Sequence, residues 1–283
     1  MRPFSSRVVL AFDAASVSAA LVRRGLGAPR VASSSSVRLP EGALVPSAVA
    51  RNLQAPEEVG RAIREALGSL GRGRAGVTLV LPHGVSRLAI LDLPRGHEPT
   101  EYARFRLGAS LPYPASEAVV DFLPLEQKRL LAAAVRHEVV AEYESVAASA
   151  GIARSRVDLA PLAAAAGAGP IAIGFPSATV CLVLGDTACC FLAYDRGRLL
   201  GVRTRRRDPE RGEAERLRED ALRTAAASGL FGEPELVVGG SGARGVLDQW
   251  TAAGREARLL SLHAEEGPLH EAGARPWLAA ALA

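Results

Sequence analysis

The sequence predicts an α/β protein of two lobes, with a small α/β subdomain inserted in the first lobe. Segments typical of strands alternate with segments of helical periodicity along the chain of 283 residues. A strand, a bend and a return strand occur twice, near residues 7–22 and 179–194, as a duplicated fold would require. The predicted divisions are a first lobe at 1–75, an insertion at 76–157, a return helix and link at 158–177, and a reduced second lobe at 178–283.

The first lobe is expected to begin with a strand from Arg7, a bend at Asp13–Ser16 and a return strand to Val22. Residues 31–39 contain four serines followed by Val-Arg-Leu, which favours a polar edge strand; a low-complexity segment is the alternative. From Pro56, apolar residues recur at helical spacing as far as Leu70. Proline near the first turn and glycine after the end are typical of a helix.

Strands and helices also alternate in the predicted insertion and in the link that follows it. The strands are expected at 77–81, 87–93, 118–124 and 130–135, and the helices at 98–110 and 137–150. Gly151 is placed to end the second helix in a left-handed conformation. Asp158 is placed to cap a short alanine-rich helix that ends at Gly167.

A meander of three strands at 178–207 organises the second lobe. Its strands are expected at 179–184, 188–194 and 198–204, separated by Gly185-Asp186-Thr187 and by a tight turn at 195–197. A helix at 210–228 follows, and then a buried strand at 235–238 that runs into Gly239-Gly240-Ser241-Gly242. A helix to about Ala253, a strand at 257–262 and a C-terminal helix from Pro276 complete the prediction.

Composition restricts the classes of function. The chain is 48% hydrophobic and 23% charged, which is typical of a globular protein, and its net charge of +4 permits an anionic partner without requiring one. Lys128 is the one lysine, so no other lysine can serve a phosphate loop or a Schiff base. Cys181, Cys189 and Cys190 are interpreted as reduced core residues. Without a leader pattern or a long apolar run, we expect a soluble, intracellular protein.

The bend Gly185-Asp186-Thr187 resembles the second phosphate-binding hairpin of the actin-like ATPase superfamily. Three longer stretches are informative: LPEGALVPSAVARN with VTLVLP, then EYARFRLGASLPYPASEAVVDFLPLE, then AAAVRHEVVAEYESVAASAGIARSRVDL. In this order they resemble the PilM family, the actin-like proteins on the cytoplasmic side of the type IV pilus inner-membrane platform. The resemblance implies a two-lobed actin-like (ribonuclease H-like) fold, a plan that the cell-division protein FtsA shares.

The resemblance also implies a nucleotide cleft between the lobes. The candidate cofactor-binding residues are Asp13, Ser16, Gly185, Asp186, Thr187, Gly239, Gly240, Ser241 and Gly242. The cleft departs from the family pattern, because Ala15 and Ala20 stand where the family has a glycine and a lysine, and Val183 where it has an acid. The pattern favours packing over nucleotide binding as the role of the glycines, and turn capping over Mg²⁺ binding as the role of the two aspartates. We therefore expect no catalytic residue and no metal site.

Two surface features bear on partners. The first is a basic cluster of Arg203, Arg205, Arg206, Arg207 and Arg211, interpreted as a solvated hairpin end. Its second interpretation is contact with an anionic membrane, and nucleic acid is not expected because no aromatic residues are interleaved. The second feature is a set of aromatic residues that could line a groove for a partner peptide or pack in a core: Tyr102, Phe105, Tyr113 and Phe122.

Together these features favour a non-catalytic scaffold of a type IV pilus or related type II secretion platform. By resemblance, it would bind the cytoplasmic tail of a PilN-like membrane protein and other platform proteins, and so lie peripheral to the inner membrane without a cofactor. One alternative is an actin-like ATPase or ATP-gated switch that binds ATP and Mg²⁺. Another is an FtsA-like filament protein, which would need an amphipathic C-terminal anchor that Trp277–Ala283 does not resemble.

Overall fold

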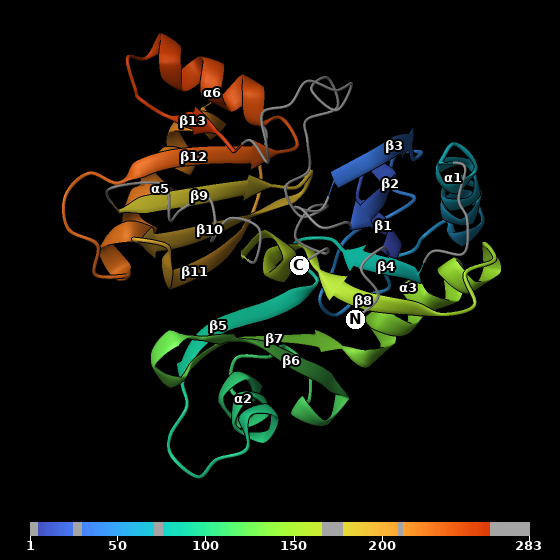
Figure 1. Cartoon of the computed structure of the whole chain (residues 1–283), viewed down its shortest axis with the longest axis horizontal. Helices are drawn as coiled ribbons and strands as arrows, with labels where there is room; N and C mark the ends of the chain where they lie inside the picture. Colours follow the sequence, from blue (N-terminus) through green and yellow to red (C-terminus); the bar gives the residue numbers. More distant parts are fainter. Residues whose placement is uncertain (1–4, 25–29, 71–75, 166–177, 209–211, 261–283) are drawn as a thin grey trace.

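The computed structural model describes residues 5–24, 30–70, 76–165, 178–208 and 212–260 (Figure 1). The first lobe contains a five-stranded sheet with the order β3-β2-β1-β4-β8. Its strands are β1 (Ser5–Asp13), β2 (Ser16–Arg24), β3 (Arg30–Arg38), β4 (Gly76–Leu81) and β8 (Ser155–Leu159). Because β1 is antiparallel to β2 and parallel to β4, the β1–β2 bend lies at the edge of the sheet where β4 also ends.

The second lobe repeats this topology, with the order β11-β10-β9-β12-β13. Its strands are β9 (Thr179–Leu184), β10 (Ala188–Asp195), β11 (Arg198–Arg206), β12 (Glu235–Gly240) and β13 (Arg258–Leu259). As in the first lobe, the central strand β9 is antiparallel to the second strand and parallel to the fourth. The predicted duplication of a two-lobed α/β fold is confirmed, and the serine-rich segment 30–38 is an edge strand.

Helices cover the two sheets. In the first lobe, α1 (Pro56–Gly68) packs against β2, β3 and α3 (His137–Ser149). The residues of α1 that recur at helical spacing, among them Val59 and Ile63, are buried. In the second lobe, α5 (Glu213–Ala227) packs against β9, β10 and β11, and α6 (Ala243–Ala252) against β12 and β13. Gly151 after α3 has a φ of 90°, the left-handed conformation predicted for it.

The insertion is a separate three-stranded antiparallel sheet with the order β5-β7-β6. It comprises β5 (Ser86–Asp92), β6 (Ala118–Leu125) and β7 (Arg129–Arg136), with α2 (Pro99–Gly108) packed on it. Two short 3-10 helices, η1 (Ala115–Glu117) and η2 (Glu126–Lys128), flank β6. The predicted range 76–157 also includes β4 and the first three residues of β8, which pair within the first sheet. The inserted sheet itself extends only from Ser86 to Arg136.

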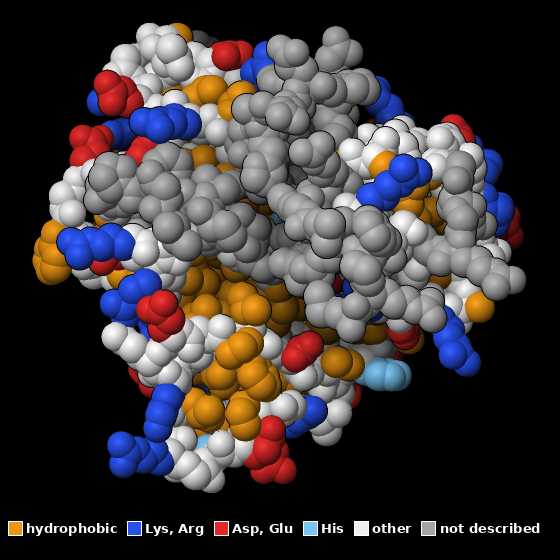
Figure 2. All heavy atoms as spheres, in the orientation of Figure 1, with side chains coloured by type: hydrophobic (Ala, Val, Ile, Leu, Met, Phe, Trp, Pro, Cys, Tyr) orange, Lys and Arg blue, Asp and Glu red, His pale blue; other side chains and the backbone are white. Residues whose placement is uncertain are grey.

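The two lobes share a hydrophobic core. This core includes Phe12 and Leu79 from the first sheet together with Val183 and Leu192 from the second. A second core lies between the second sheet and its helices, and a third lies inside the insertion under α2. The insertion also touches the second lobe, since β5 packs against β11 (Figure 1). On the face shown in Figure 2, hydrophobic side chains gather over this junction.

Some predicted elements fall partly or wholly outside the described residues. Asp158 belongs to β8, and its Oδ1 accepts a hydrogen bond from the Leu159 N–H at 2.7 Å. Helical structure begins at residue 160 and is described as far as 165; the C-terminal helix expected from Pro276 lies outside the described part. In the described residues, no helix has the length and apolar character needed to cross a membrane.

Candidate functional site

The three bends predicted to form a nucleotide cleft come together between the lobes. Two of them follow the central strand of a sheet, β1 or β9, and the third lies at the end of β12, the neighbour of β9. The β1–β2 bend carries Asp13 and Ser16, and the β9–β10 bend carries Gly185, Asp186 and Thr187. The glycine turn comprises Gly239 and Gly240, the last residues of β12, together with Ser241 and Gly242. Hydrogen bonds among Asp13, Asp186 and Ser241 connect these three bends, which lie far apart in the sequence.

Asp13 and Asp186 join the lobes through a reciprocal pair of hydrogen bonds. The Asp186 N–H donates to Oδ2 of Asp13, and the Ala15 N–H donates to Oδ2 of Asp186, both at 2.9 Å. Asp13, which is 4% exposed, also accepts from the Ala14 N–H at 2.9 Å through Oδ1. Each carboxylate therefore caps the bend of the opposite lobe. We call this arrangement the carboxylate clasp.

Ser241 ties the glycine turn to the clasp. Its hydroxyl donates to Oδ1 of Asp186 at 2.6 Å, and its N–H donates to the Leu184 carbonyl at 2.8 Å. Amide and hydroxyl donors at such bends are the groups that bind phosphate in nucleotide sites. Here the Ala15 and Asp186 amides and the Ser241 hydroxyl are occupied by acceptors of this chain. Over the described residues, no group of three or more His, Cys, Asp or Glu side chains is arranged to hold a metal ion.

Arg207 lies between the second bend, the glycine turn and the start of α5. Its side chain is only 7% exposed. One nitrogen, Nη1, donates to the carbonyls of Gly185 at 2.6 Å and Ser241 at 2.9 Å. Nε and Nη2 each donate to Glu213 at 2.9 Å. Burial lowers the pKa of the guanidinium, but the hydrogen bonds and charge of Glu213 outweigh this effect and leave that pKa raised, so Arg207 stays charged.

The role of Arg207 in the cleft is a structural finding that the sequence did not predict. From the sequence, Arg207 is interpreted as part of a solvated cluster because it follows other arginines. In the structure, Arg203 and Arg205 pair with Asp220, whereas Arg207 pairs with Glu213. A Cβ added to Gly242 would lie 3.7 Å from Nη2 of Arg207, so the guanidinium group rests against the glycine turn. No local signal marks Glu213 as its partner, because the pair forms only when β11 and α5 are packed together.

The glycine turn is required for packing. Gly240 has a φ of 97°, in the left-handed region that side chains rarely adopt. A Cβ there would overlap the carbonyl oxygen of Leu184 and lie 2.9 Å from its amide nitrogen. The close approach of β12 to β9 thus accounts for a glycine at this position, which is the packing role that the sequence left open.

The residues that depart from the family pattern lie in or beside the shared core. Ala20 in β2 and Val183 in β9 are fully buried there, in place of the family's lysine and acid. His83 is buried beside the second bend, and its Cδ2 would lie 3.0 Å from a Cβ on Gly185. Burial lowers the pKa of His83 to about 3, so its imidazole is neutral at pH 7 and adds no positive charge to the cleft.

The basic cluster is largely engaged in internal ion pairs. Arg203 and Arg205 both pair with Asp220, whose side chain is 3% exposed, and Arg207 pairs with Glu213. Within the described part of the chain, Arg206 is the cluster residue that is exposed and forms no ion pair. Arg211 lies outside the described residues. Asp220 also pairs with Arg223 of α5, and a buried acid with three arginine partners is a structural feature of the β11–α5 packing.

The four aromatic residues predicted to contact a partner do not share one surface. Tyr102, Tyr113 and Phe122 are partly buried against the core of the insertion. Tyr102 also lies against Arg106, whose guanidinium carbon is 5.9 Å from the ring centroid. Phe105 on α2 is 79% exposed. Of the four, only Phe105 therefore presents its side chain to a partner.

The three cysteines should be inert in the folded protein. All are buried, and burial raises the pKa of Cys181 and Cys189 from 9.0 to about 12 and raises that of Cys190 as well. A rise of three units lowers the thiolate fraction at pH 8 about a thousandfold. We expect a thiol reagent to modify the native protein more slowly by at least that factor than the protein in urea. Rapid labelling of native protein would contradict this prediction.

Neither a family model nor a curated protein sequence matches the chain. Solved structures do match it. A PilM–PilN type IV pilus biogenesis complex aligns with a TM-score of 0.70 and 18% identity, over 98% of this chain and 96% of the other. A Bacteroides thetaiotaomicron protein with an actin-like ATPase fold and unknown function aligns with a TM-score of 0.60 and 9% identity, over 90% and 91%.

A third structure is the cytoplasmic domain of EpsL, an inner-membrane component of the type II secretion system of Vibrio cholerae. It aligns with a TM-score of 0.56 and 11% identity, over 98% of this chain and 95% of the other. At these identities, the similarity concerns the fold. The predicted fold class is confirmed: the chain has the two-lobed actin-like ATPase fold. Within this fold, the β1–β2 and β9–β10 bends are joined across the lobes by the hydrogen bonds of Asp13 and Asp186.

Proposed function

We propose that this chain is a non-catalytic scaffold of an inner-membrane assembly platform, of the type IV pilus or type II secretion kind. The carboxylate clasp is the observation that carries the proposal. In an actin-like ATPase fold the two bends face a nucleotide, whereas here their backbone donors bind the carboxylates of Asp13 and Asp186. The similarity to PilM in its complex with PilN, and to the EpsL domain, supports the assignment to an assembly platform.

A triphosphate could occupy this cleft only at considerable cost. Both hydrogen bonds of the clasp and the Ser241–Asp186 hydrogen bond would have to break. The freed carboxylates would then face the phosphates as like charges. The sole lysine, Lys128, lies in η2 of the insertion, and Arg207 is held by Glu213. The site therefore favours a closed, ligand-free state over ATP-dependent switching.

The partner in this proposal is the cytoplasmic tail of a PilN-like membrane protein, together with other platform proteins. The chain would then lie in the cytoplasm, peripheral to the inner membrane through these partners. Direct contact with anionic lipids is less favoured, because Arg203, Arg205 and Arg207 form internal ion pairs. Of the described residues of the basic cluster, this leaves Arg206 without an ion pair. Phe105 is the predicted aromatic contact that a partner can reach.

Titration with ATP and Mg²⁺ tests the non-catalytic part of the proposal. We expect no heat of binding in isothermal titration calorimetry and no shift in the melting temperature at millimolar ATP. A ligand present at 100 times its Kd would stabilise the fold by about 2.7 kcal/mol, which such a measurement detects easily. Micromolar binding of ATP would show a working cleft and overturn this part.

A pull-down with the cytoplasmic tail of a PilN-like protein encoded beside this chain tests the scaffold part. Capture that persists at moderate salt is the expected result. A tail with its sequence scrambled is the matched control, since it keeps the composition and charge. Equal capture of both tails, or of neither, would contradict the proposed partner.

Breaking the clasp should have a local effect and a global one. In Asp186→Ala, the Ala15 N–H and the Ser241 hydroxyl lose an ionised acceptor, so we expect the free energy of unfolding to fall by about 2 kcal/mol. Amide exchange at Ala15 should accelerate at least tenfold. Asp248→Ala, which removes an exposed aspartate from α6, is the control and should change stability by less than about 0.5 kcal/mol. Unchanged protection of Ala15 would show that the clasp does not hold the lobes.

A further inference from the structure

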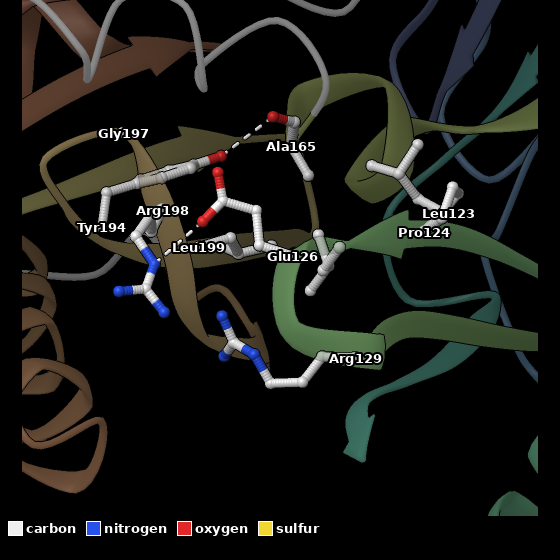
Figure 3. A pocket seen from close by; sticks show the side chains of 10 residues that line it. Leu123, Pro124, Glu126, Arg129, Ala165, Tyr194, Gly197, Arg198 and Leu199 are labelled. Carbon is white, nitrogen blue, oxygen red and sulfur yellow. Dashed lines mark hydrogen bonds and ion pairs between the residues drawn. The ribbon is translucent and has the colours of Figure 1, made fainter. Parts of the chain in front are cut away.

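A pocket of about 190 Å³ lies where the insertion meets the second lobe (Figure 3). Two tight turns border it. One joins β6 to β7 and supplies Glu126 and Arg129, and the other joins β10 to β11 and supplies Arg198. Leu123, Leu125 and Leu199 form its apolar part. Since an engineered cavity of about 150 Å³ binds benzene, this pocket can hold a group of that size.

Two arginine Nε groups at the pocket are buried and make no hydrogen bond, although one of them belongs to an ion pair. Throughout the described residues, Nε of Arg129 and Nε of Arg198 have no hydrogen-bond partner. Nε of Arg198 lies 3.0 Å from Oε2 of Glu126, so the two charges pair, but the N–H is not directed at that oxygen. In Figure 3 the guanidinium groups of Arg129 and Arg198 both lie below the carboxylate of Glu126, and a dashed line joins Arg198 to Glu126. Folded proteins leave few buried donors unsatisfied, and two at one pocket indicate an absent acceptor.

The other polar groups of the pocket do not satisfy these donors. The Tyr194 hydroxyl donates to the Ala165 carbonyl at 2.9 Å. Among the described residues that line the pocket, Glu126 is the one acid, against two arginines, and its side chain is 70% exposed. The pocket therefore has a surplus positive charge and room for a single carboxylate. A carboxylate can accept hydrogen bonds from two guanidinium groups at once.

Two tight hairpin turns fix the border of the pocket. Gln127 and Lys128 both have a φ of 59°, and Arg196 and Gly197 have φ values of 46° and 78°. Positive φ at both central residues is the geometry of a type I′ hairpin turn, which joins antiparallel strands directly. The two turns therefore place Arg129 and Arg198, the residues that follow them, at the border of the pocket.

We propose that this pocket binds an acidic side chain on an extended peptide segment of a protein partner. The carboxylate would accept hydrogen bonds from Nε of Arg129 and Nε of Arg198, and a neighbouring apolar side chain would pack against the leucines. A peptide is favoured because β6 is an edge strand of the inserted sheet, and an edge strand can pair with an added chain. This site is separate from the clasp and does not depend on the function proposed above.

Nitrogen–proton correlation spectra of arginine Nε groups on the full chain test the proposal directly. The probe is the peptide acetyl-Thr-Val-Glu-Leu-Thr-amide, and its matched control carries glutamine in place of glutamate. We expect the glutamate peptide to shift the Nε signals of Arg129 and Arg198 saturably, and the glutamine peptide to bind at least about tenfold more weakly. Equal shifts with both peptides, or none with either, would overturn the proposal.

Variants establish where the peptide binds. Arg129→Gln and Arg198→Gln should each weaken binding at least about tenfold. The Nε signal that disappears from the spectrum of each variant belongs to the substituted arginine. Arg129→Lys keeps the charge but removes the Nε donor, and serves if the glutamine variant does not fold. Arg206→Gln removes an exposed arginine of the same lobe and should bind as the wild type does. If Arg206→Gln weakened binding as much as the pocket variants do, the loss of net charge alone would explain their effect, and the proposed pocket would be contradicted.

A titration with a small carboxylic acid distinguishes a peptide ligand from a free metabolite. Titration with 4-methylpentanoate supplies the carboxylate and the apolar group without a backbone. We expect it to shift the same Nε signals but to bind at least about tenfold more weakly than the glutamate peptide, because it cannot pair with β6. Binding as tight as that of the peptide would overturn the assignment to a protein partner.

Discussion

Gly240→Val should lower the free energy of unfolding by about 4 kcal/mol or more, or prevent folding altogether. Gly240 has a φ of 97°, where a β-branched residue is strained, and any Cβ would overlap the Leu184 carbonyl. The obstacle is the backbone of β9, which cannot move aside as a flexible side chain could. Relief would require β12 to separate from β9 and thus open the second sheet. Urea denaturation followed by circular dichroism measures the loss.

Gly245→Ala is the matched control for this variant. Gly245 lies within α6, and a Cβ there would meet no described atom within 4 Å. Alanine in a helix limits the unfolded chain more than glycine does, so stability should be unchanged or rise by up to about 1 kcal/mol. The variant pair also distinguishes the two functions. A folded, stable Gly240→Val protein that had lost a wild-type affinity for ATP would support the ATPase alternative.

Arg207→Met should cost about 3–5 kcal/mol, because it leaves Glu213 charged and mostly buried without a partner. The carbonyls of Gly185 and Ser241 would lose their donor in the same step. The effect should spread to the clasp, since Gly185 and Ser241 adjoin Asp186 or bond to it. Chemical denaturation gives the size of the loss, and amide exchange at Asp186 reports its spread.

Two further variants show whether the ion pair is responsible. Arg206→Met alters the neighbouring exposed arginine and should change stability by less than about 0.5 kcal/mol. Arg207→Met combined with Glu213→Leu removes both charges and should recover much of the stability lost in the single variant, because replacing a whole buried pair is often neutral. A double variant no more stable than Arg207→Met would show that packing, not the unpaired charge, causes the loss.

Most elements of the fold could be predicted because their signals are local. Glycine and aspartate between β-rich runs marked the β9–β10 bend, and apolar spacing after Pro56 marked α1. The extent of the insertion could not be predicted in this way. Nothing within residues 76–81 or 155–159 shows that these strands pair with β1 and with each other, since pairing depends on distant partners. The prediction therefore assigned two strands of the first sheet to the insertion.

The candidate site was predictable in its parts but not in its contacts. The three bends could be found because glycine and short polar residues follow apolar strands. The clasp could not, because its Asp186–Asp13 hydrogen bond joins residues 173 positions apart. Arg207 was obscured by its neighbours: in a run of arginines, local pattern does not show which side chain turns inward. The pocket between the insertion and the second lobe was missed for the same reason, since it forms only where two turns meet.

The reciprocity of the clasp has a consequence for how related sequences can change. Asp13 occupies the amide of Asp186, and Asp186 occupies the amide of Ala15, so the loss of either acid leaves a donor of the other lobe unpaired. Both donors are backbone N–H groups that no substitution removes, so replacing both acids leaves both donors unpaired and the two losses add. Homologues with the same interlobe pairing should therefore keep a side chain that accepts a hydrogen bond at each position, whereas lineages that regain a phosphate-binding lysine and glycine should lose the pairing.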